Sequence, residues 1–297
     1  MLSFKPIELS DRPIFERYYR ENNSLLSEYC FANNFSWSKI FNISFAETNG
    51  LLVIKTFYDE MSYLFPVGSG DIKPVIQKII EQSEGEEFSI QGISKENKAL
   101  LETIFPDVFE ITDDRNTFDY VYETSRLATL SGKKLHSKRN HMNRFAEIYP
   151  NYSFEQITPE NIKECAEMNE LWCKINSEYA DKLMNEEICH VRRLLKNYFA
   201  LDLSGGLIRI DGQVVAFSIG SRLADDCFIV HVEKALSEYR GVYQAINMRF
   251  VNEFCLDCKW VNREDDGGNE GLRKAKMSYD PAFLTEKYVA RLKKQGV

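Results

Sequence analysis

The chain has 297 residues, enough for two domains of ordinary size, and its apolar (44%) and charged (28%) fractions are those of a soluble globular protein. No run approaches the roughly 18 apolar residues that a membrane span needs, and the N-terminus lacks the apolar core of a signal peptide. The net charge of −8 argues against nucleic-acid binding over the whole surface, DNA binding included.

The first half of the chain predicts helices and strands in alternation. Ser10 and Asp11 are typical N-cap residues, Pro13 is tolerated in a first helical turn, and Asn49-Gly50 is a hairpin turn. In chain order we expect a helix from Ser10, a helix over 31–41, strands over 43–47, 51–57 and 61–67, a helix after 68–71, a strand over 88–91, a helix over 94–105, and strands over 108–112 and 117–122. The last two strands are expected to close this half as a pair.

The second half repeats this order of elements. We expect a strand over 152–156, helices over 158–175 and 185–198, strands over 206–210, 214–221 and 227–232, a helix over 242–254, a strand ending at Val261, a helix over 269–276 and a strand near Tyr288. This order predicts a mixed α/β fold in which helices cover both faces of a sheet. Such sheets bind ligands at the carboxyl ends of central strands, here after Val232 or after Val261.

The cysteines and histidines favour no metal site. Seven cysteines, an odd number in apolar context, indicate reduced thiols and a cytoplasmic protein of bacterial type. Cys255 and Cys258 have zinc-like spacing but no second pair, so we interpret them as half-buried helical positions. The four histidines are dispersed, and His231, in an apolar strand, is interpreted as a core or pocket-wall residue.

One segment of the chain is strongly basic. From Thr124 to Ala146 the chain has no acidic residue. It has six basic residues there, which are Arg126, Lys133, Lys134, Lys138, Arg139 and Arg144. We expect a helix from about Lys133 that connects the two halves. Two interpretations stay open: a solvated linker helix, or a surface for a phosphate-rich partner such as tRNA, a nucleotide cofactor or lipid headgroups.

Three strings, together with Asn116 to Tyr120, carry a resemblance to a known family. They are Thr129 to His141, Glu238 to Asn247, and Asn262 to Lys276. They resemble a bacterial domain family named after the C-terminal domain of phosphatidylglycerol lysyltransferases, which is related to Fem-type aminoacyl transferases. The order of elements is similar to that of GNAT-type acyltransferases, here twice in tandem. We therefore expect a GNAT-like domain over 1–125, the basic connecting helix over 126–150, and a GNAT-like domain carrying the site over 151–297.

The resemblance implies an acyl- or aminoacyl-transferase. The group would pass from a phosphate-bearing donor, acyl-coenzyme A or aminoacyl-tRNA, to an amine or hydroxyl acceptor. Two alternatives stay open: a non-catalytic binding protein that keeps the fold, and an aminoacyl transferase that acts on lipid headgroups. No amphipathic anchor is evident, so a lipid acceptor has the least support and any contact with a membrane surface is expected to be weak.

In GNAT enzymes, a loop of the form Gln/Arg-x-x-Gly-x-Gly/Ala before a helix binds the pyrophosphate of coenzyme A. The corresponding loop here has one glycine and a tyrosine where a small residue is expected: Arg240, Gly241, Val242, Tyr243, Gln244, Ala245. A helix N-terminus still favours an anion, so coenzyme A, the phosphate of another donor and a plain turn all stay open. The basic segment, through Lys134, Lys138 and Arg139, is expected to hold the phosphates of the donor.

The polar run after Val261 is the expected catalytic site. Acyl transfer needs a nucleophile relieved of its proton and a stabilised oxyanion. Glu264 or Asp265 is the expected base, with Glu233, at the end of the preceding strand, as a second candidate. Substrate and charge are expected to be held by Asn262, Arg263, Lys274, Lys276 and Tyr279, the last of which either packs or acts as an acid. The alternative is a local network in which Asp265 or Asp266 pairs with Arg263 and Arg273.

Overall fold

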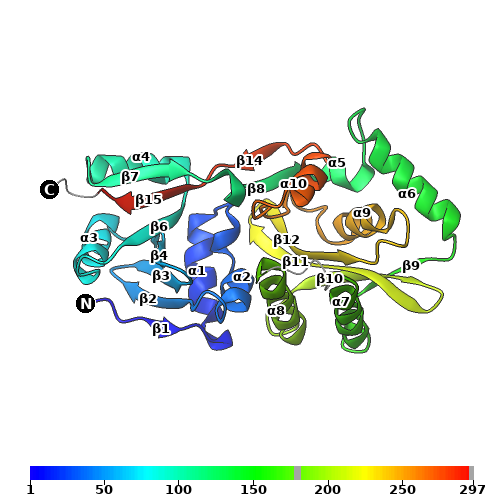
Figure 1. Cartoon of the computed structure of the whole chain (residues 1–297), viewed down its shortest axis with the longest axis horizontal. Helices are drawn as coiled ribbons and strands as arrows, with labels where there is room; N and C mark the ends of the chain where they lie inside the picture. Colours follow the sequence, from blue (N-terminus) through cyan, green and yellow to red (C-terminus); the bar gives the residue numbers. More distant parts are fainter. Residues whose placement is uncertain (177–181, 294–297) are drawn as a thin grey trace. The chain divides into compact units, whose positions relative to one another are not determined.

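The computed structural model describes residues 1–176 and 182–293, and Figure 1 shows its helices and strands. The chain divides into two compact units. The first comprises Met1–Asp119, Asp265–Gly268 and the segment from Thr285 on, and the second comprises Tyr120–Glu264 and Asn269–Leu284. These bounds differ from the three successive segments expected from the sequence, because the chain passes between the units more than once.

The first unit is built on a mixed sheet of eight strands within the described residues, in the order β1-β2-β3-β4-β6-β15-β7 with β5 paired to β3. Its strands are β1 (Lys5–Pro6), β2 (Ser44–Thr48), β3 (Leu51–Phe57), β4 (Met61–Leu64), β5 (Val67–Gly68), β6 (Phe88–Ile93), β7 (Phe109–Asp113) and β15 (Tyr288–Leu292). Its α-helices are α1 (Arg12–Asn22), α2 (Phe31–Trp37), α3 (Ile72–Gln82) and α4 (Lys95–Ile104), and its 3₁₀ helices are η1 (Leu9–Asp11), η2 (Ser27–Tyr29) and η3 (Arg115–Thr117).

Alternation along β3 explains how helices cover both faces of this sheet. Successive side chains of a strand point to opposite faces. Val53 packs into a core with Val75 of α3. The next residue, Ile54, points to the other face, and its cross-strand partner Phe45 meets Phe15 of α1 with ring centroids 4.8 Å apart.

The second unit has a seven-stranded sheet within the described residues, in the order β14-β8-β13-β12-β11-β10-β9. Its strands are β8 (Asp119–Glu123), β9 (Ser153–Gln156), β10 (Ser204–Ile210), β11 (Gln213–Ala224), β12 (Cys227–Ala235), β13 (Trp260–Asn262) and β14 (Phe283–Thr285). Its helices are α5 (Thr124–Thr129), α6 (His136–Ile148), α7 (Ile162–Asn176), α8 (Lys182–Lys196), α9 (Val242–Phe254) and α10 (Glu270–Met277).

Helices lie on both faces of this second sheet. Figure 1 shows α9 on one face of the sheet and α7 and α8 on the other. Phe250 of α9 packs on Phe228 of β12, with ring centroids 5.9 Å apart. On the opposite face, the Lys234 ammonium of β12 lies 3.6 Å from the ring centroid of Trp172 in α7. Because both faces are covered, polar residues of β12 contact either α9 or the α7–α8 pair.

The central strands β12 and β13 part at their carboxyl ends. They run parallel and pair only from Cys227 with Trp260 to Ile229 with Asn262. Beyond Asn262 the chain follows β8 instead: the Arg263 N–H donates to the Tyr120 carbonyl (2.9 Å), and the Tyr120 N–H donates to the Glu264 carbonyl (3.2 Å). Among the described strands, residues 230–235 of β12 therefore have no partner on this edge, and side chains fill the space between the diverging strands.

A β-bulge lies in β12 just past the point of divergence. Ile219 of β11 pairs with Val232, but the next residue, Gly220, pairs with Val230. His231 is therefore the extra residue of the bulge. Bulges redirect side chains and are frequent beside active sites.

The bulge also requires a glycine and changes which side chains share a face. A Cβ at Gly220 would lie 2.3 Å from the Ile229 carbonyl oxygen, so only glycine allows this close approach. After the bulge, Glu233 faces α9, where it contacts Asn247. His231 lies on the opposite side, close to His190 of α8.

The structure corrects two expectations about strand pairing. The strands expected at 108–112 and 117–122 exist as β7 and β8, but they lie in different sheets rather than forming a pair. The final strand at Tyr288, expected in the second half, is β15 and pairs with β6 and β7 in the sheet of the first unit. Both partnerships involve residues far apart in the sequence, and local patterns do not encode them.

Candidate functional site

A buried ion pair links the diverging strands on the α9 side. Arg263 Nη2 donates to Glu233 Oε1 at 3.0 Å, and the two side chains are 11% and 12% exposed. Asn247 Nδ2 of α9 donates to the other carboxylate oxygen at 2.9 Å. Burial alone would lower the pKa of Arg263, but the Glu233 carboxylate raises that pKa overall, so Arg263 is charged.

Two atoms of this cluster have unused hydrogen-bonding capacity. Arg263 Nη1 and Asn247 Oδ1 are buried and have no hydrogen-bond partner among the described residues. Buried polar atoms in proteins are nearly always paired, so such an exception calls for an explanation. One leftover donor and one leftover acceptor suit a polar ligand that carries both kinds of group.

The aromatic ring of Tyr279 completes the cluster. The Arg263 guanidinium lies 4.8 Å from the ring centroid and the Lys138 ammonium 4.5 Å from it. Burial, together with the Arg263 charge, lowers the pKa of Lys138. Burial raises the pKa of Tyr279 to about 12, and Gln244 hydrogen-bonds to its side chain. Tyr279 therefore keeps its hydroxyl proton at neutral pH, and its ring makes cation–π contacts with Arg263 and Lys138.

A second polar cluster lies on the α7–α8 side. His231 Nδ1 is 3.0 Å from Glu264 Oε1, and His231 Nε2 is 2.9 Å from Ser221 Oγ. The His231 side chain is fully buried, whereas that of Glu264 is 23% exposed. Burial, followed by the nearby His231, lowers the pKa of His190 well below its usual value, so His190 is neutral at physiological pH.

Three contacts hold Glu264 in an unusual backbone conformation. Its φ is +55°, in the left-handed region that non-glycine residues rarely adopt. The Asn262 side-chain oxygen accepts from the Glu264 N–H at 2.6 Å. Lys276 Nζ donates to the carbonyl oxygens of Arg263 (2.7 Å) and Glu264 (3.2 Å). Backbone strain of this kind persists only where the surroundings impose it, and it is concentrated at functional sites.

The chain matches a known protein family over most of its length. A family model described as phosphatidylglycerol lysyltransferase, C-terminal, matches residues 20–291 of the chain. The chain belongs to this family. In the described part of this lysyltransferase-family chain, no helix is both long and apolar enough to cross a membrane.

Two proteins are similar to this chain in sequence. An uncharacterised protein of Mycoplasmoides gallisepticum is 28% identical over 189 residues, a match that covers 62% of this chain and 58% of that protein. The crystal structure of a conserved protein of unknown function from Bacteroides thetaiotaomicron is 40% identical, covers 99% of this chain and 100% of that one, and has a TM-score of 0.94.

Two structures share the fold at low sequence identity. The C-terminal domain of a putative lysylphosphatidylglycerol synthetase from Agrobacterium fabrum is 13% identical with a TM-score of 0.67, covering 96% of this chain and 92% of that one. L-PGS from Bacillus licheniformis is 14% identical with a TM-score of 0.63, covering 96% and 93%. At these identities the likeness concerns the fold alone. The predicted mixed α/β fold class is confirmed, with a mixed sheet in each of the two units.

Half of the predicted site residues of this lysyltransferase-family domain come together in the second unit. The residues gathered around the diverging strands are Glu233, Asn262, Arg263, Glu264, Lys276, Tyr279, Lys138 and Gln244. Lys276, expected to stabilise charge, directs its ammonium at two backbone carbonyls. Lys274, on the same helix, is exposed.

Asp265 and Glu264 are adjacent in sequence but belong to different units. Asp265 belongs to the first unit, and its Oδ1 accepts from the Gly267 N–H at 2.8 Å. Asp266, in the same segment, contacts Arg115 at 3.4 Å, and the alternative network that pairs Asp265 or Asp266 with Arg263 and Arg273 stays a prediction. The two neighbouring carboxylates proposed as alternative bases therefore have different surroundings, and only Glu264 lies beside an imidazole.

The loop before α9 is shaped by helix packing. Gly241 has a φ of +90°, and a Cβ there would lie 2.5 Å from the His141 carbonyl of α6. Val242 is a core residue, and Tyr243 hydrogen-bonds to Trp172 of α7. Arg240 is exposed. The single glycine of this loop thus allows close contact between α6 and α9, and phosphate binding by the loop stays a prediction.

Much of the charge in the basic segment is matched by groups of the second unit. Arg126 and Lys134 contact the two oxygens of Asp280 at 2.6 and 2.8 Å. Arg139 donates to the carbonyls of Leu130 and Gly132, which end α5 and the following turn. These contacts favour a structural part for the segment, although Lys134 is still 74% exposed.

Sequence reasoning missed Ser221 and Asn247 and interpreted His231 as a wall residue. His231 and Ser221 lie on neighbouring strands, and Asn247 lies on α9, which covers the opposite face of those strands. An isolated polar residue inside each apolar element was the only available signal, and the bulge that aims His231 has no sequence signature of its own.

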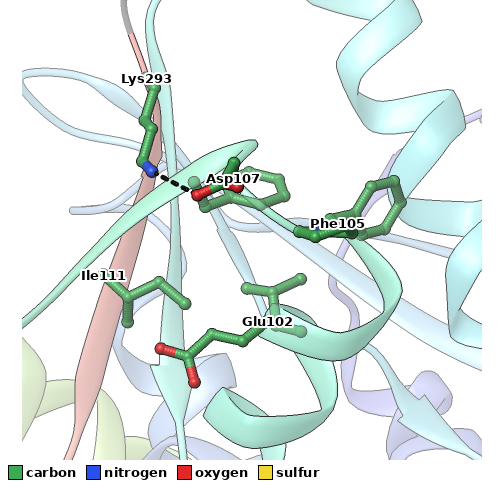
Figure 2. A pocket seen from close by; sticks show the side chains of 8 residues that line it. Glu102, Phe105, Asp107, Ile111 and Lys293 are labelled. Atoms are coloured by element: carbon green, nitrogen blue, oxygen red, sulfur yellow. Dashed lines mark hydrogen bonds and ion pairs between the residues drawn. The ribbon is translucent and has the colours of Figure 1, made fainter.

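A cavity of about 320 Å³ lies elsewhere, in the first unit between α4 and β7. Figure 2 shows its labelled lining residues, with Lys293 and Asp107 joined across one side at 3.4 Å. None of the predicted site residues lines it. Its wall is formed by Leu101, Phe105, Phe109 and Ile111 with charges at the rim, so it offers no evident reactive group.

Proposed function

We propose that this domain transfers an acyl or aminoacyl group to an amine or hydroxyl acceptor at the carboxyl ends of β12 and β13. The observation that carries the proposal is the pair of His231 and Glu264, 3.0 Å apart where two parallel strands diverge. An imidazole oriented by a carboxylate is the commonest general base in enzymes. The carboxyl ends of parallel strands are also the usual ligand sites of α/β sheets.

The neighbouring cluster suits the remaining needs of the reaction. Arg263 Nη1 has an N–H to offer to a carbonyl or phosphate oxygen, and Asn247 Oδ1 can accept from an N–H or O–H. Arg263 and Lys138, both against the Tyr279 ring, supply positive charge on the α9 side of the diverging strands, which favours an anionic donor. The base would take the proton of the acceptor and return it to the leaving group.

The proposed donor carries phosphates and an activated acyl group, as acyl-coenzyme A and aminoacyl-tRNA do. The family description, a lysyltransferase, supports an aminoacyl group. The exposed Lys134 and the half-buried Lys138 on the basic segment support a nearby phosphate. The acceptor in this chain is proposed only as a nucleophilic amine or hydroxyl.

Two measurements test the proposal. Either donor, at about 100 times its Kd, should raise the free energy of unfolding by about 2.7 kcal/mol, measured by thermal unfolding. Glu264→Gln should lower donor consumption at least about 100-fold, because the imidazole loses its carboxylate partner. Glu238→Gln, an exposed carboxylate, is the matched control and should change neither. No stabilisation and no consumption with either donor would exclude the proposed activity.

A non-catalytic binding protein is the second candidate, favoured by the loop before α9. Its single glycine, Gly241, serves helix packing and leaves no second glycine for close approach of a phosphate. In that case Glu264→Gln should keep the affinity of the wild type for the donor, and the wild type itself should show no turnover.

A further inference from the structure

We propose that the buried ion pair between Glu233 and Arg263 positions the proposed general base, so that Glu233 is a positioning residue and not a base itself. The inference rests on the proposed acyl transfer and goes beyond it, because it assigns the contact that keeps Glu264 within reach of His231. On sequence alone Glu233 is the second candidate base, but the contacts of its side chain indicate another part.

Glu233 is poorly placed to take a proton from a substrate. Both of its carboxylate oxygens accept hydrogen bonds from protein groups, Oε1 from Arg263 Nη2 at 3.0 Å and Oε2 from Asn247 Nδ2 at 2.9 Å. Its side chain is only 12% exposed. A carboxylate held by two donors of the protein has less capacity left for a substrate, whereas a general base must reach the proton that it takes.

The ion pair spans the gap between the two diverging strands. The parallel pairing of β12 with β13 ends at Asn262, and the next residue, Arg263, has a main-chain partner in Tyr120 of β8. Main-chain pairing with β12 therefore does not fix how far Arg263 stands from that strand. The Glu233 carboxylate, on β12, does so by accepting from the Arg263 guanidinium across the gap. Separating the two charges inside the protein would leave each without its compensating partner, which is costly.

The proposed base crosses the same gap on the other face of the sheet. Glu264 Oε1, a carboxylate oxygen that can only accept, takes the hydrogen bond of His231 Nδ1–H at 3.0 Å. His231 and Glu233 are two residues apart on β12, and because of the bulge they point to opposite faces. Arg263 and Glu264 share a peptide bond, so the distance that the ion pair sets on one face also constrains the distance between Glu264 and His231 on the other.

Asn247 fixes the carboxylate of Glu233 in turn. It lies on α9, is 1% exposed, and donates from Nδ2 to Glu233 Oε2. A catalytic pair has to be held within a fraction of an ångström by residues whose own side chains are locked by packing and hydrogen bonds. The contacts from Asn247 through Glu233 to Arg263 meet that requirement, because they link a packed helix to the peptide that presents Glu264.

Steady-state kinetics of the full chain test the inference. Glu233→Gln keeps the shape of the side chain but removes its charge, and Glu233→Leu removes the contact altogether. In both variants kcat for donor consumption should fall at least about tenfold, because the base is displaced. The KM for the donor should change less than about twofold, because Arg263 is still present to bind it. Glu155→Gln, the control, removes a carboxylate partner of Arg209 between β9 and β10, whose main chains are paired, and should change neither constant.

An imidazole resonance gives a second measurement that needs no donor. The His231 side chain is fully buried, and its Nδ1 proton is bound to a carboxylate. In protein with isotope-labelled histidine this proton should give a downfield signal, assigned by its loss in His231→Gln. Glu233→Gln and Glu233→Leu should broaden or shift the signal, and Glu155→Gln should leave it unchanged. Circular dichroism of each variant checks the fold, and Glu233→Gln alone decides if Glu233→Leu does not fold.

The outcomes separate this inference from the proposed function. If the His231 signal of folded Glu233→Gln matches that of the wild type, the ion pair does not position the base and the inference is wrong. A loss of turnover with that unchanged signal would mean that Glu233 takes the proton itself. A changed signal with wild-type turnover would also overturn the inference. If the wild type consumes neither donor, the proposed donors fail, and a changed His231 signal in Glu233→Gln still supports the positioning role.

Discussion

At the scale of single residues, the conformation of Glu264 depends on the neighbouring Lys276. Lys276 is 9% exposed, and its ammonium group donates hydrogen bonds to the carbonyl oxygens of Arg263 and Glu264. Charge-assisted hydrogen bonds to a backbone are stronger than neutral ones. The hydrogen bonds from Lys276 offset the backbone strain of Glu264, whose φ is positive, and hold its carboxylate toward His231.

Replacing Lys276 by methionine should therefore affect both stability and activity. Methionine fills similar space but removes a charged donor from the carbonyls of Arg263 and Glu264, of which the second keeps the Tyr120 N–H. The free energy of unfolding should therefore fall by about 2 kcal/mol in chemical denaturation. Donor consumption should fall at least about tenfold, because Glu264 is no longer fixed. Lys274→Met, on the exposed side of α10, should change stability by less than about 0.5 kcal/mol. Equal effects of the two variants would refute a specific part for Lys276.

At the scale of elements, the contact between α6 and α9 depends on one glycine. The chain turns from β12 into α9 at Gly241, directly under the His141 carbonyl of α6. This turn places Asn247, one and a half turns along α9, against Glu233. The packing of a helix thereby decides the position of a side chain in the candidate site.

Gly241→Ala should destabilise the protein by about 3 kcal/mol. A Cβ would meet the His141 carbonyl at 2.5 Å, and the residue would have to keep a φ of +90°. Gly212→Ala separates the two effects, since Gly212 has a φ of +84° with nothing within 4 Å of the added Cβ. Backbone strain alone should make Gly212→Ala about 1 kcal/mol less stable than the wild type, measured by urea unfolding. A Gly241→Ala effect no larger than this would show that α6 moves aside freely.

At the scale of the whole molecule, each sheet incorporates a strand that sequence order assigns elsewhere. In the first unit this arrangement creates a buried ionic network from three distant segments. Lys287 is 2% exposed, and its Nζ donates to Glu28 Oε1 and Asp119 Oδ1, both at 2.8 Å. It also donates to Ser27 Oγ at 3.1 Å. The network holds β15 in its sheet by contacts that an isolated strand could not make.

The network should make the stability of the protein depend on pH. Burial raises the pKa of Glu28 from 4.5 to about 7, an effect that Lys287 only partly offsets. Between these pH values the folded chain binds more protons than the unfolded chain, so the free energy of unfolding falls as the pH rises through this window. The contribution is fully present below about pH 4.5 and is lost by about pH 7.

Glu28→Gln should remove this dependence. The stability of the variant relative to the wild type should increase by about 2 kcal/mol between pH 5 and pH 8, measured by denaturant unfolding at each pH. Glu286→Gln, an exposed carboxylate near Lys287 in sequence, should show no such trend. Parallel stability curves for wild type and Glu28→Gln would mean that Glu28 is ionised throughout this range.

Much of the local structure could be predicted from residue patterns. The helix over 242–254 and the short helix after Asn269 were placed within a residue, because apolar spacing and capping residues are local signals. The clustering of polar residues after Val261 also identified the strand end that forms the candidate site. The basic helix was expected from about Lys133 but begins at His136, after a separate short helix, α5.

By itself, the sequence determined which segments become helices and strands and that the sheets are mixed and covered on both faces. It also placed Glu233 near the end of one buried strand and Arg263 and Glu264 after another. Only the tertiary structure decided that β7 and β8 separate, that Asp265 parts from Glu264, and that Ser221, His231 and Glu264 meet. Helix and strand periodicity depends on neighbours a few residues apart. Strand partners, the bulge at His231 and the left-handed backbone conformation of Glu264 depend instead on contacts between residues farther apart in the sequence.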